Sequence, residues 1–195
     1  MDLITGGTMR HLYSMTLLFV LCFSSIGMAD EISALTAKAK AGEIESQFNL
    51  GMMYYEGRGV AQDYQQARGW LQKAAEQGFG GAQYNLGLMY AKGEGVTQDY
   101  QQALIWWQKA AEQGYAWAQY NLGLMYGRGQ GVPQDYVQSH KWLRIAATSG
   151  LENAKQLVDK LGEQLTPEQS TESLRLASEW LESHSPDRTH QAQGK

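Results

Sequence analysis

The sequence predicts an all-α solenoid, an array of about three helical hairpins of 36 residues each. Three observations lead to this fold class. Gly51, Gly87 and Gly123, each preceded by leucine, stand 36 residues apart, and a fixed period of roughly 20–50 residues is typical of repeat proteins. Within each period the apolar residues follow helical spacing. A glycine-containing turn separates the two helical stretches of each period.

Composition and charge exclude several classes of protein. The chain has 195 residues, 43% of them apolar, which is enough for a packed core and argues against wholesale disorder. Its formal net charge of −4 argues against a nucleic-acid-binding protein, because such proteins normally present a basic face. A single cysteine cannot form a disulfide or a thiolate metal site within one chain. We therefore expect no cofactor and no metal.

Residues 1–29 have the pattern of a signal peptide. Arg10 precedes a mostly apolar run over Met15–Phe23, and small residues lead to Gly27-Met28-Ala29. This is a basic region, a short apolar region and a small-x-small cleavage site, with cleavage expected after Ala29. The apolar run is shorter than the ~20 residues that a membrane-spanning helix needs. We expect no membrane span in the mature chain.

The predicted mature chain contains no cysteine, because Cys22 lies inside the apolar region of the leader. Large apolar residues precede Cys22, whereas a lipoprotein signal has small residues there, so lipidation is not expected. The mature chain also lacks an N-glycosylation sequon. These features favour a bacterial periplasmic or secreted location. The sequence leaves open whether Met1 or Met9 is the true start.

The element boundaries follow from the glycines that end each period and from helix-capping residues. After the repeats, Thr166 is expected to cap a last helix whose first position is Pro167. The predicted units are an N-terminal capping helix at 30–42, three full repeats at 43–78, 79–114 and 115–150, a degenerate fourth repeat at 151–163, a C-terminal capping helix at 164–183 and a loose tail at 184–195.

The middle repeat illustrates how the residues specify two helices. Ala82 and Leu86 belong to the apolar stripe of the first helix. Gly93 can adopt the left-handed conformation that ends a helix. Asp99 is expected to cap the second helix, and Gln102, three residues later, would complete a capping box. Asp63 and Asp135 hold the same position in the other repeats, and we interpret all three as helix caps rather than as a metal site.

A bulky residue on the second helix is expected to face the glycine of the first. Trp106 recurs as Trp70 and Trp142, and we place it opposite Gly87, where a missing side chain lets another helix approach. Burial of such an aromatic side chain contributes roughly 1.5–3 kcal/mol. Because one hairpin cannot cover its own apolar face, stability is expected to come from stacking of neighbouring repeats.

This pattern resembles the Sel-one-like repeat family, a relative of the tetratricopeptide repeats. The resemblance covers about residues 43–150 and implies a right-handed superhelix of α/α hairpins that acts as a protein-interaction scaffold in bacterial envelope or signalling assemblies. The residues that carry it in the middle repeat are Ala82, Leu86, Gly87, Tyr90, Gly93, Gly95, Val96, Asp99, Ala103, Trp106, Ala110, Ala111 and Gly114.

By the same resemblance, the first helices of the hairpins line a concave groove that binds a peptide or protein segment. The candidate residues form an aromatic column and an aliphatic column, joined by one tryptophan and by two asparagines that could bond to a ligand's backbone. They are Phe48, Met52, Tyr84, Asn85, Leu88, Trp117, Tyr120, Asn121 and Leu124. The alternative is that these residues only pack neighbouring helices together.

The sequence does not predict an enzyme, and no catalytic residue is assigned. His140 has no second histidine or carboxylate at ligand spacing, and we expect it at the surface or at an edge. Basic residues that grip a carboxylate in some tetratricopeptide domains are missing from the equivalent positions, so no such clamp is expected there. Two other functions remain open. One is cell-wall-fragment or β-lactam binding or hydrolysis, as in cysteine-rich relatives. The other is a structural spacer whose own C-terminal helix fills the groove.

Cleavage after Ala29 gives the first testable prediction. We expect the exported protein to begin at Asp30, because the small residues before this position fit the cleavage site of a signal peptide. Intact-mass measurement of the protein recovered from the cell envelope checks this start. A mass that still includes Met15–Phe23 would contradict it.

Overall fold

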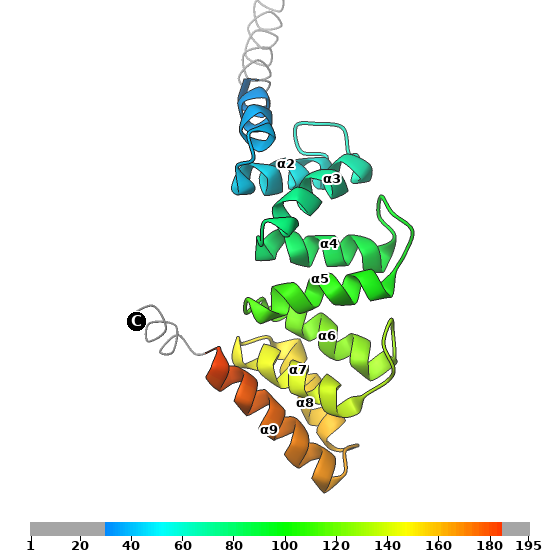
Figure 1. Cartoon of the computed structure of the whole chain (residues 1–195). Coiled ribbons are helices and arrows are strands. Elements are labelled where there is room, and N and C mark those ends of the chain that lie inside the picture. Colours follow the sequence, from blue (N-terminus) through cyan, green and yellow to red (C-terminus); the bar gives the residue numbers. More distant parts are fainter. Residues whose placement is uncertain (1–29, 185–195) are drawn as a thin grey trace, which may run out of the picture.

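The computed structural model describes residues 30–184, and all regular structure in this range is helical. The predicted signal peptide and the tail after His184 lie outside the described residues. A helical segment at 30–40 is followed by α2 (Ile44–Glu56), α3 (Tyr64–Glu76), α4 (Gly80–Lys92), α5 (Tyr100–Glu112), α6 (Ala116–Arg128), α7 (Tyr136–Thr148), α8 (Glu152–Gly162) and α9 (Pro167–Ser183). The helices stack in chain order (Figure 1). The predicted all-α repeat array is confirmed.

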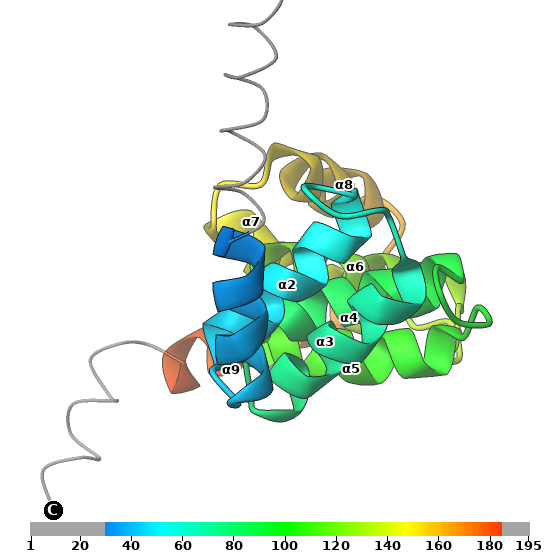
Figure 2. The ribbon, with the colours of Figure 1, turned by 90° about the horizontal axis from the view of Figure 1, so that it is seen from above.

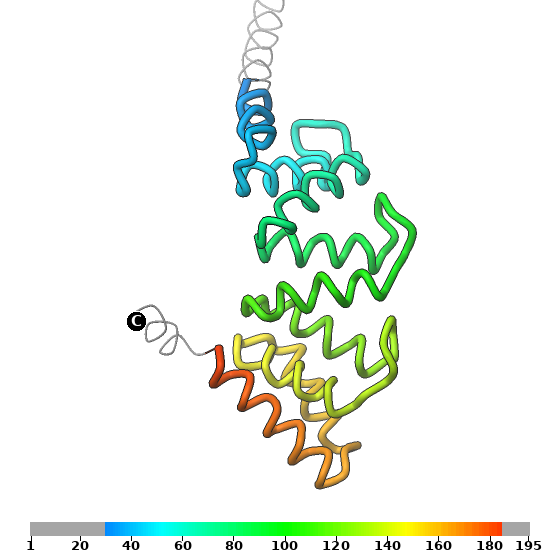
Figure 3. The backbone as a smooth tube through the Cα atoms, viewed as in Figure 1, coloured from blue at the N-terminus to red at the C-terminus, as the bar shows by residue number. Residues whose placement is uncertain are grey.

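The stack is built from antiparallel hairpins. The pairs α2/α3, α4/α5 and α6/α7 make the closest helix–helix packing, and α8 packs on α7 as the first helix of a fourth unit. The backbone trace repeats the same path in each unit, with the longer loops of the hairpins along one edge of the stack (Figure 3). Each unit therefore contacts mainly its neighbours, as in other solenoids.

Inside the middle hairpin, the side chain that faces Gly87 is Trp107. A Cβ atom at Gly87 would lie 2.5 Å from the Trp107 ring, and the indole nitrogen donates to the Tyr84 carbonyl at 3.1 Å. This corrects the expectation that Trp106 lies there. Trp106 is instead buried between α3 of the preceding hairpin and α4 of its own hairpin. In the other two hairpins a leucine takes the place of the tryptophan: Leu71 faces Gly51, and Leu143 faces Gly123.

The three aspartates cap the second helices, but the predicted capping box does not form there. Asp99 accepts hydrogen bonds from the backbone of Gln101 and Gln102. The backbone N–H of Asp99, which the Gln102 side chain would have to bind, already donates to the Tyr90 carbonyl at 2.9 Å. The backbone N–H groups of Asp63 and Asp135 likewise donate to tyrosine carbonyls of the preceding helix. The full capping box forms at Thr166, whose backbone N–H is bound by the Gln169 side chain.

A buried glutamine joins each hairpin to the one before it. The Gln83 side chain of α4 donates to the Ala75 carbonyl at 3.1 Å, and its oxygen accepts from the Gln113 side chain at 2.7 Å. Gln47 and Gln119 make the same bond to the preceding helix, each at 3.1 Å. Because buried polar groups are costly when unpaired, these bonds favour one orientation of neighbouring hairpins. The sequence analysis did not single them out.

The C-terminal helix α9 packs on α7. The Trp180 ring meets the Trp142 ring at 5.9 Å, and its indole nitrogen donates to Glu112 of α5 at 3.0 Å. Seen from above, α8 and the end of α9 project on opposite sides of the stack (Figure 2). The structural-spacer hypothesis required this helix to fill the groove on the first helices, and the contacts of α9 with α7 do not support it.

His140 is buried at the α7–α9 contact, and not at the surface or at an edge as the sequence predicts. Its Nδ1 atom lies 2.8 Å from the Ser173 hydroxyl, and that hydroxyl donates to the Ser170 carbonyl. Burial lowers the pKa of His140, and the positive charge of Arg144 lowers it further. The sequence could not show this burial, because the helix that covers His140 lies 33 residues further along the chain, at Ser173.

The glutamine junction is incomplete in the third repeat, which makes it testable. Ser149 stands where the other repeats have Gln77 and Gln113, and Gln119 Oε1 has no hydrogen-bond partner among the described residues. We expect Ser149→Gln to supply the missing donor and to stabilise the protein by about 1 kcal/mol. Urea unfolding measures the change. Ser149→Ala is the control and should give no gain; a Ser149→Gln midpoint at or below that of the unmodified protein would contradict the prediction.

Candidate functional site

All nine candidate residues lie on the first helices of the three hairpins. Trp117 is 47% exposed, and the other eight are partly exposed. We call this surface of α2, α4 and α6 the groove face. It consists of Phe48, Met52, Tyr84, Asn85, Leu88, Trp117, Tyr120, Asn121 and Leu124. Equivalent positions on successive stacked helices form the two predicted columns.

The aromatic residues of the groove face are held by contacts with other rings and polar groups. The Phe48 ring lies 4.9 Å from the Phe79 ring, and Trp117 meets Tyr120 edge-on at 5.8 Å. Burial raises the pKa of Tyr84, and this shift is opposed by the charge of Lys92 and by a hydrogen bond with Asn121. These contacts restrict the rotamers of the aromatic side chains, so the surface is largely preformed.

The two asparagines are engaged within the protein. The Asn85 side chain donates to the Gly81 carbonyl of its own helix at 2.8 Å. Asn121 lies near Tyr84 of the neighbouring first helix and opposes the rise in the pKa of Tyr84. The Asn85 amide is thus occupied within its own helix, whereas Asn121 lies where two first helices meet, as the packing alternative considered from the sequence would have it. The apolar members also serve packing, since Met52 and Leu88 border the buried clusters.

One ion pair lies beside the groove face in the middle repeat. Lys92 is 3.6 Å from Glu94, and Glu94 also accepts a hydrogen bond from the Tyr55 hydroxyl at 2.7 Å. This group joins the first and second repeats. In the third repeat the positions of Lys92 and Glu94 hold Arg128 and Gln130, so the acidic partner is replaced by a neutral amide.

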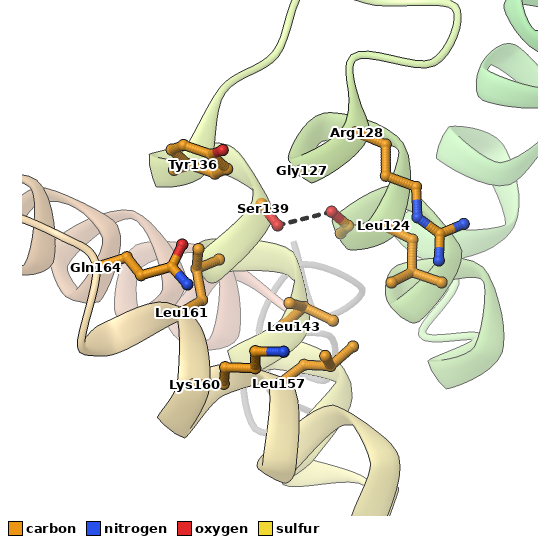
Figure 4. A pocket seen from close by; sticks show the side chains of 11 residues that line it. Leu124, Gly127, Arg128, Tyr136, Ser139, Leu143, Leu157, Lys160, Leu161 and Gln164 are labelled. Atoms are coloured by element: carbon orange, nitrogen blue, oxygen red, sulfur yellow. Dashed lines mark hydrogen bonds between the residues drawn. The ribbon is translucent and has the colours of Figure 1, made fainter.

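The groove face leads into a pocket that the sequence analysis missed. The pocket has a volume of about 230 Å³ and lies between α6, α7 and α8 (Figure 4). Leu124 is its only lining residue that was predicted for the groove, and Leu143, Leu157 and Lys160 are among the others. A hollow of about 180 Å³ lies one repeat earlier, between α4, α5 and α6, and Leu124 lines it as well. Position-by-position comparison of the repeats could have revealed both.

Within residues 30–184, no group of three or more His, Cys, Asp or Glu side chains is placed to hold a metal ion. Over the same residues, none of the helices combines the length and the apolar character that crossing a membrane requires. Asp63, Asp99 and Asp135 cap separate helices.

Comparison with known proteins identifies the family. The model of the Sel1 repeat matches residues 44–79, 81–115 and 118–151. A Sel1 repeat protein from Oxalobacter formigenes has a crystal structure with a TM-score of 0.61 and 38% sequence identity, and the match covers 67% of this chain and 98% of that chain. No curated protein matches the chain.

A second similar structure is that of c5321, a protective antigen present in uropathogenic Escherichia coli strains displaying an SLR fold. The identity is 30% and the TM-score 0.53, over 83% of this chain. The match covers 43% of c5321, so this chain spans less than half of that protein's length. With three matching repeats, the chain belongs to the Sel1 repeat family. Proteins of this family generally mediate protein–protein interactions and are typically non-catalytic scaffolds.

Proposed function

We propose that this protein is exported and binds a peptide or protein segment along the groove face. The observation that carries the proposal is the exposure of apolar and aromatic side chains on α2, α4 and α6, three successive helices of the stack. An apolar surface that continues across several elements is typical of interaction sites. Export rests on the signal-peptide pattern of residues 1–29.

The geometry suits a segment that lies across the helices. Its apolar side chains would contact the aliphatic column of Met52, Leu88 and Leu124, next to the aromatic column. Because the ring contacts already restrict the aromatic side chains, binding costs less conformational entropy than on a flexible surface. Packing between helices and binding of a partner are therefore compatible roles for the same residues.

Substitutions on the groove face test the proposal. We expect Tyr84→Ala combined with Leu88→Ala to weaken binding to a partner captured from envelope extracts by roughly a hundredfold or more, because central anchors often contribute 2 kcal/mol or more each. Trp117→Ala is a second variant, which should fold normally because the side chain is half exposed. Dissociation constants measured with the purified partner report the effect, and circular dichroism reports folding.

The matched control removes exposed apolar side chains elsewhere. Ile105 of α5 and Leu174 of α9 are 42% and 39% exposed and lie outside the groove face, so Ile105→Ala with Leu174→Ala should leave binding unchanged. The proposal is wrong if the folded groove variants bind the same partner as tightly as the unmodified protein does, or if the control pair is the one that weakens binding.

A further inference from the structure

The pocket between α6, α7 and α8 exists because two positions are small in the same repeat. In the first repeat these positions hold Tyr55 and Leu71, and in the second they hold an alanine and Trp107. In the third they hold Gly127 and Leu143, which both line the pocket. The equivalent hollow of the second repeat, beside Trp107, has a volume of about 180 Å³, against about 230 Å³ for this pocket. Since protein interiors are close-packed, the smaller residues of the third repeat leave more of this space open.

The chemistry of the groove face changes at this pocket. The aliphatic column of Met52, Leu88 and Leu124 continues on α8 with Lys160, which stands 36 residues after Leu124. Arg128 of α6 lines the same pocket. Its counterpart in the second repeat, Lys92, is paired with Glu94, whereas the third repeat has the neutral Gln130 at the position of that glutamate.

Both cations border an apolar base. Arg128 extends from α6 and Lys160 from α8, with the side chains of Leu124 and Leu143 between them (Figure 4). Neither cation forms an ion pair with any residue in the described range 30–184, and no acidic residue lines the pocket. The pocket therefore combines an apolar floor with uncompensated positive charge.

We propose that this pocket receives the C-terminal residue of the bound polypeptide, with an apolar side chain among the leucines and the terminal carboxylate next to Arg128 and Lys160. The proposal rests on the proposed function, because the polypeptide reaches the pocket along the groove face. In a C-terminal residue the carboxylate and the apolar side chain share one Cα atom, which matches the adjacency of cations and leucines. An internal aspartate or glutamate would bring the charge without the apolar side chain.

The geometry also separates two contributions to affinity. Arg128 and Lys160 are exposed, so the attraction to the carboxylate is screened by solvent and salt and is weak by itself. Burial of the terminal side chain adds the apolar contribution, and both occur together only for a free C-terminus. We therefore expect affinity to fall when either group is removed and when the salt concentration is raised.

Defined probes test this inference with the purified chain from residue 30. The probes are fluorescein-labelled hexapeptides that end in leucine or phenylalanine, each made with a free carboxylate and with a C-terminal amide; a further free-acid hexapeptide ends in serine. Fluorescence anisotropy at low salt measures binding. We expect each apolar free acid to bind at least tenfold more tightly than its amide and than the serine peptide. Equal affinity of acid and amide, or no binding by any of the peptides, would overturn the proposal.

Variants locate the effect in the pocket. Leu143→Trp introduces the residue that the second repeat accommodates at this position, so it should fold, narrow the pocket where the terminal side chain would lie and weaken binding of the apolar free acids at least tenfold. Arg128→Gln with Lys160→Gln should remove the difference between acid and amide. Lys155→Gln removes one positive charge from α8, where Lys155 pairs with Glu152 away from the pocket, and should change nothing. Unchanged binding by Leu143→Trp would contradict the assignment.

The experiment also separates this inference from the proposed function. If Leu143→Trp leaves partner capture intact while Tyr84→Ala with Leu88→Ala abolishes it, the groove binds a partner and the pocket inference is wrong. If the groove variants have no effect, the proposed function itself fails. Binding of dodecanoate is measured directly by calorimetry, and binding of dodecanoate without binding of any hexapeptide would assign the pocket to an aliphatic acid and contradict the polypeptide C-terminus.

Discussion

The close approach of two helices at a glycine determines the geometry of every hairpin. At Gly87 the backbone of α4 lies against the Trp107 ring of α5 so closely that even a methyl group would overlap it. The indole nitrogen reaches the Tyr84 carbonyl from the same position. This contact sets both the distance between the helices and the rotation of α5 about its axis. The rotation in turn decides which α5 residues face the preceding hairpin, as Trp106 does.

The remaining architecture follows from this spacing. Hairpins of equal geometry stack in register, and the buried glutamines then reach a carbonyl in the last turn of the preceding second helix. The first helices meet along one side, where their apolar columns stay partly exposed, and α9 packs on α7. The size of the side chain that packs against this glycine also affects the space left open at the neighbouring surface. With Gly127 and Leu143 together in the third repeat, the pocket next to the groove face is larger than the equivalent hollow beside Trp107.

The periodic part of the fold could be predicted from the sequence, because repeated spacing is a local signal. The hairpin period, the aspartate caps and the left-handed glycine at Gly93 follow from residues within one repeat. The choice between Trp106 and Trp107 could not be made in this way. Adjacent helical residues point in directions about 100° apart. Because both residues are tryptophan, the apolar pattern does not distinguish which of the two faces Gly87.

Features that join distant segments were also missed. The bond between Gln83 and Gln113 links residues 30 positions apart, and the burial of His140 depends on where α9 packs on α7. Of the candidate site, the helical spacing placed the nine residues on the first helices, where the structure has them, but it did not reveal the internal hydrogen bond of Asn85. Their role in binding stays a prediction. The pocket depends on the joint volume of two positions on different helices, which is visible only when the repeats are compared with one another.

A double-mutant cycle on Gly87→Ala and Trp107→Ala tests the central claim most directly. If the contact determines the hairpin, Gly87→Ala strongly destabilises the unmodified protein because its methyl group meets the indole. The same change then costs much less when Trp107 is already alanine. Urea unfolding of the four proteins should give a coupling free energy of about 1–3 kcal/mol, the range for residues in contact. Additive effects, with a coupling close to zero, would contradict the account.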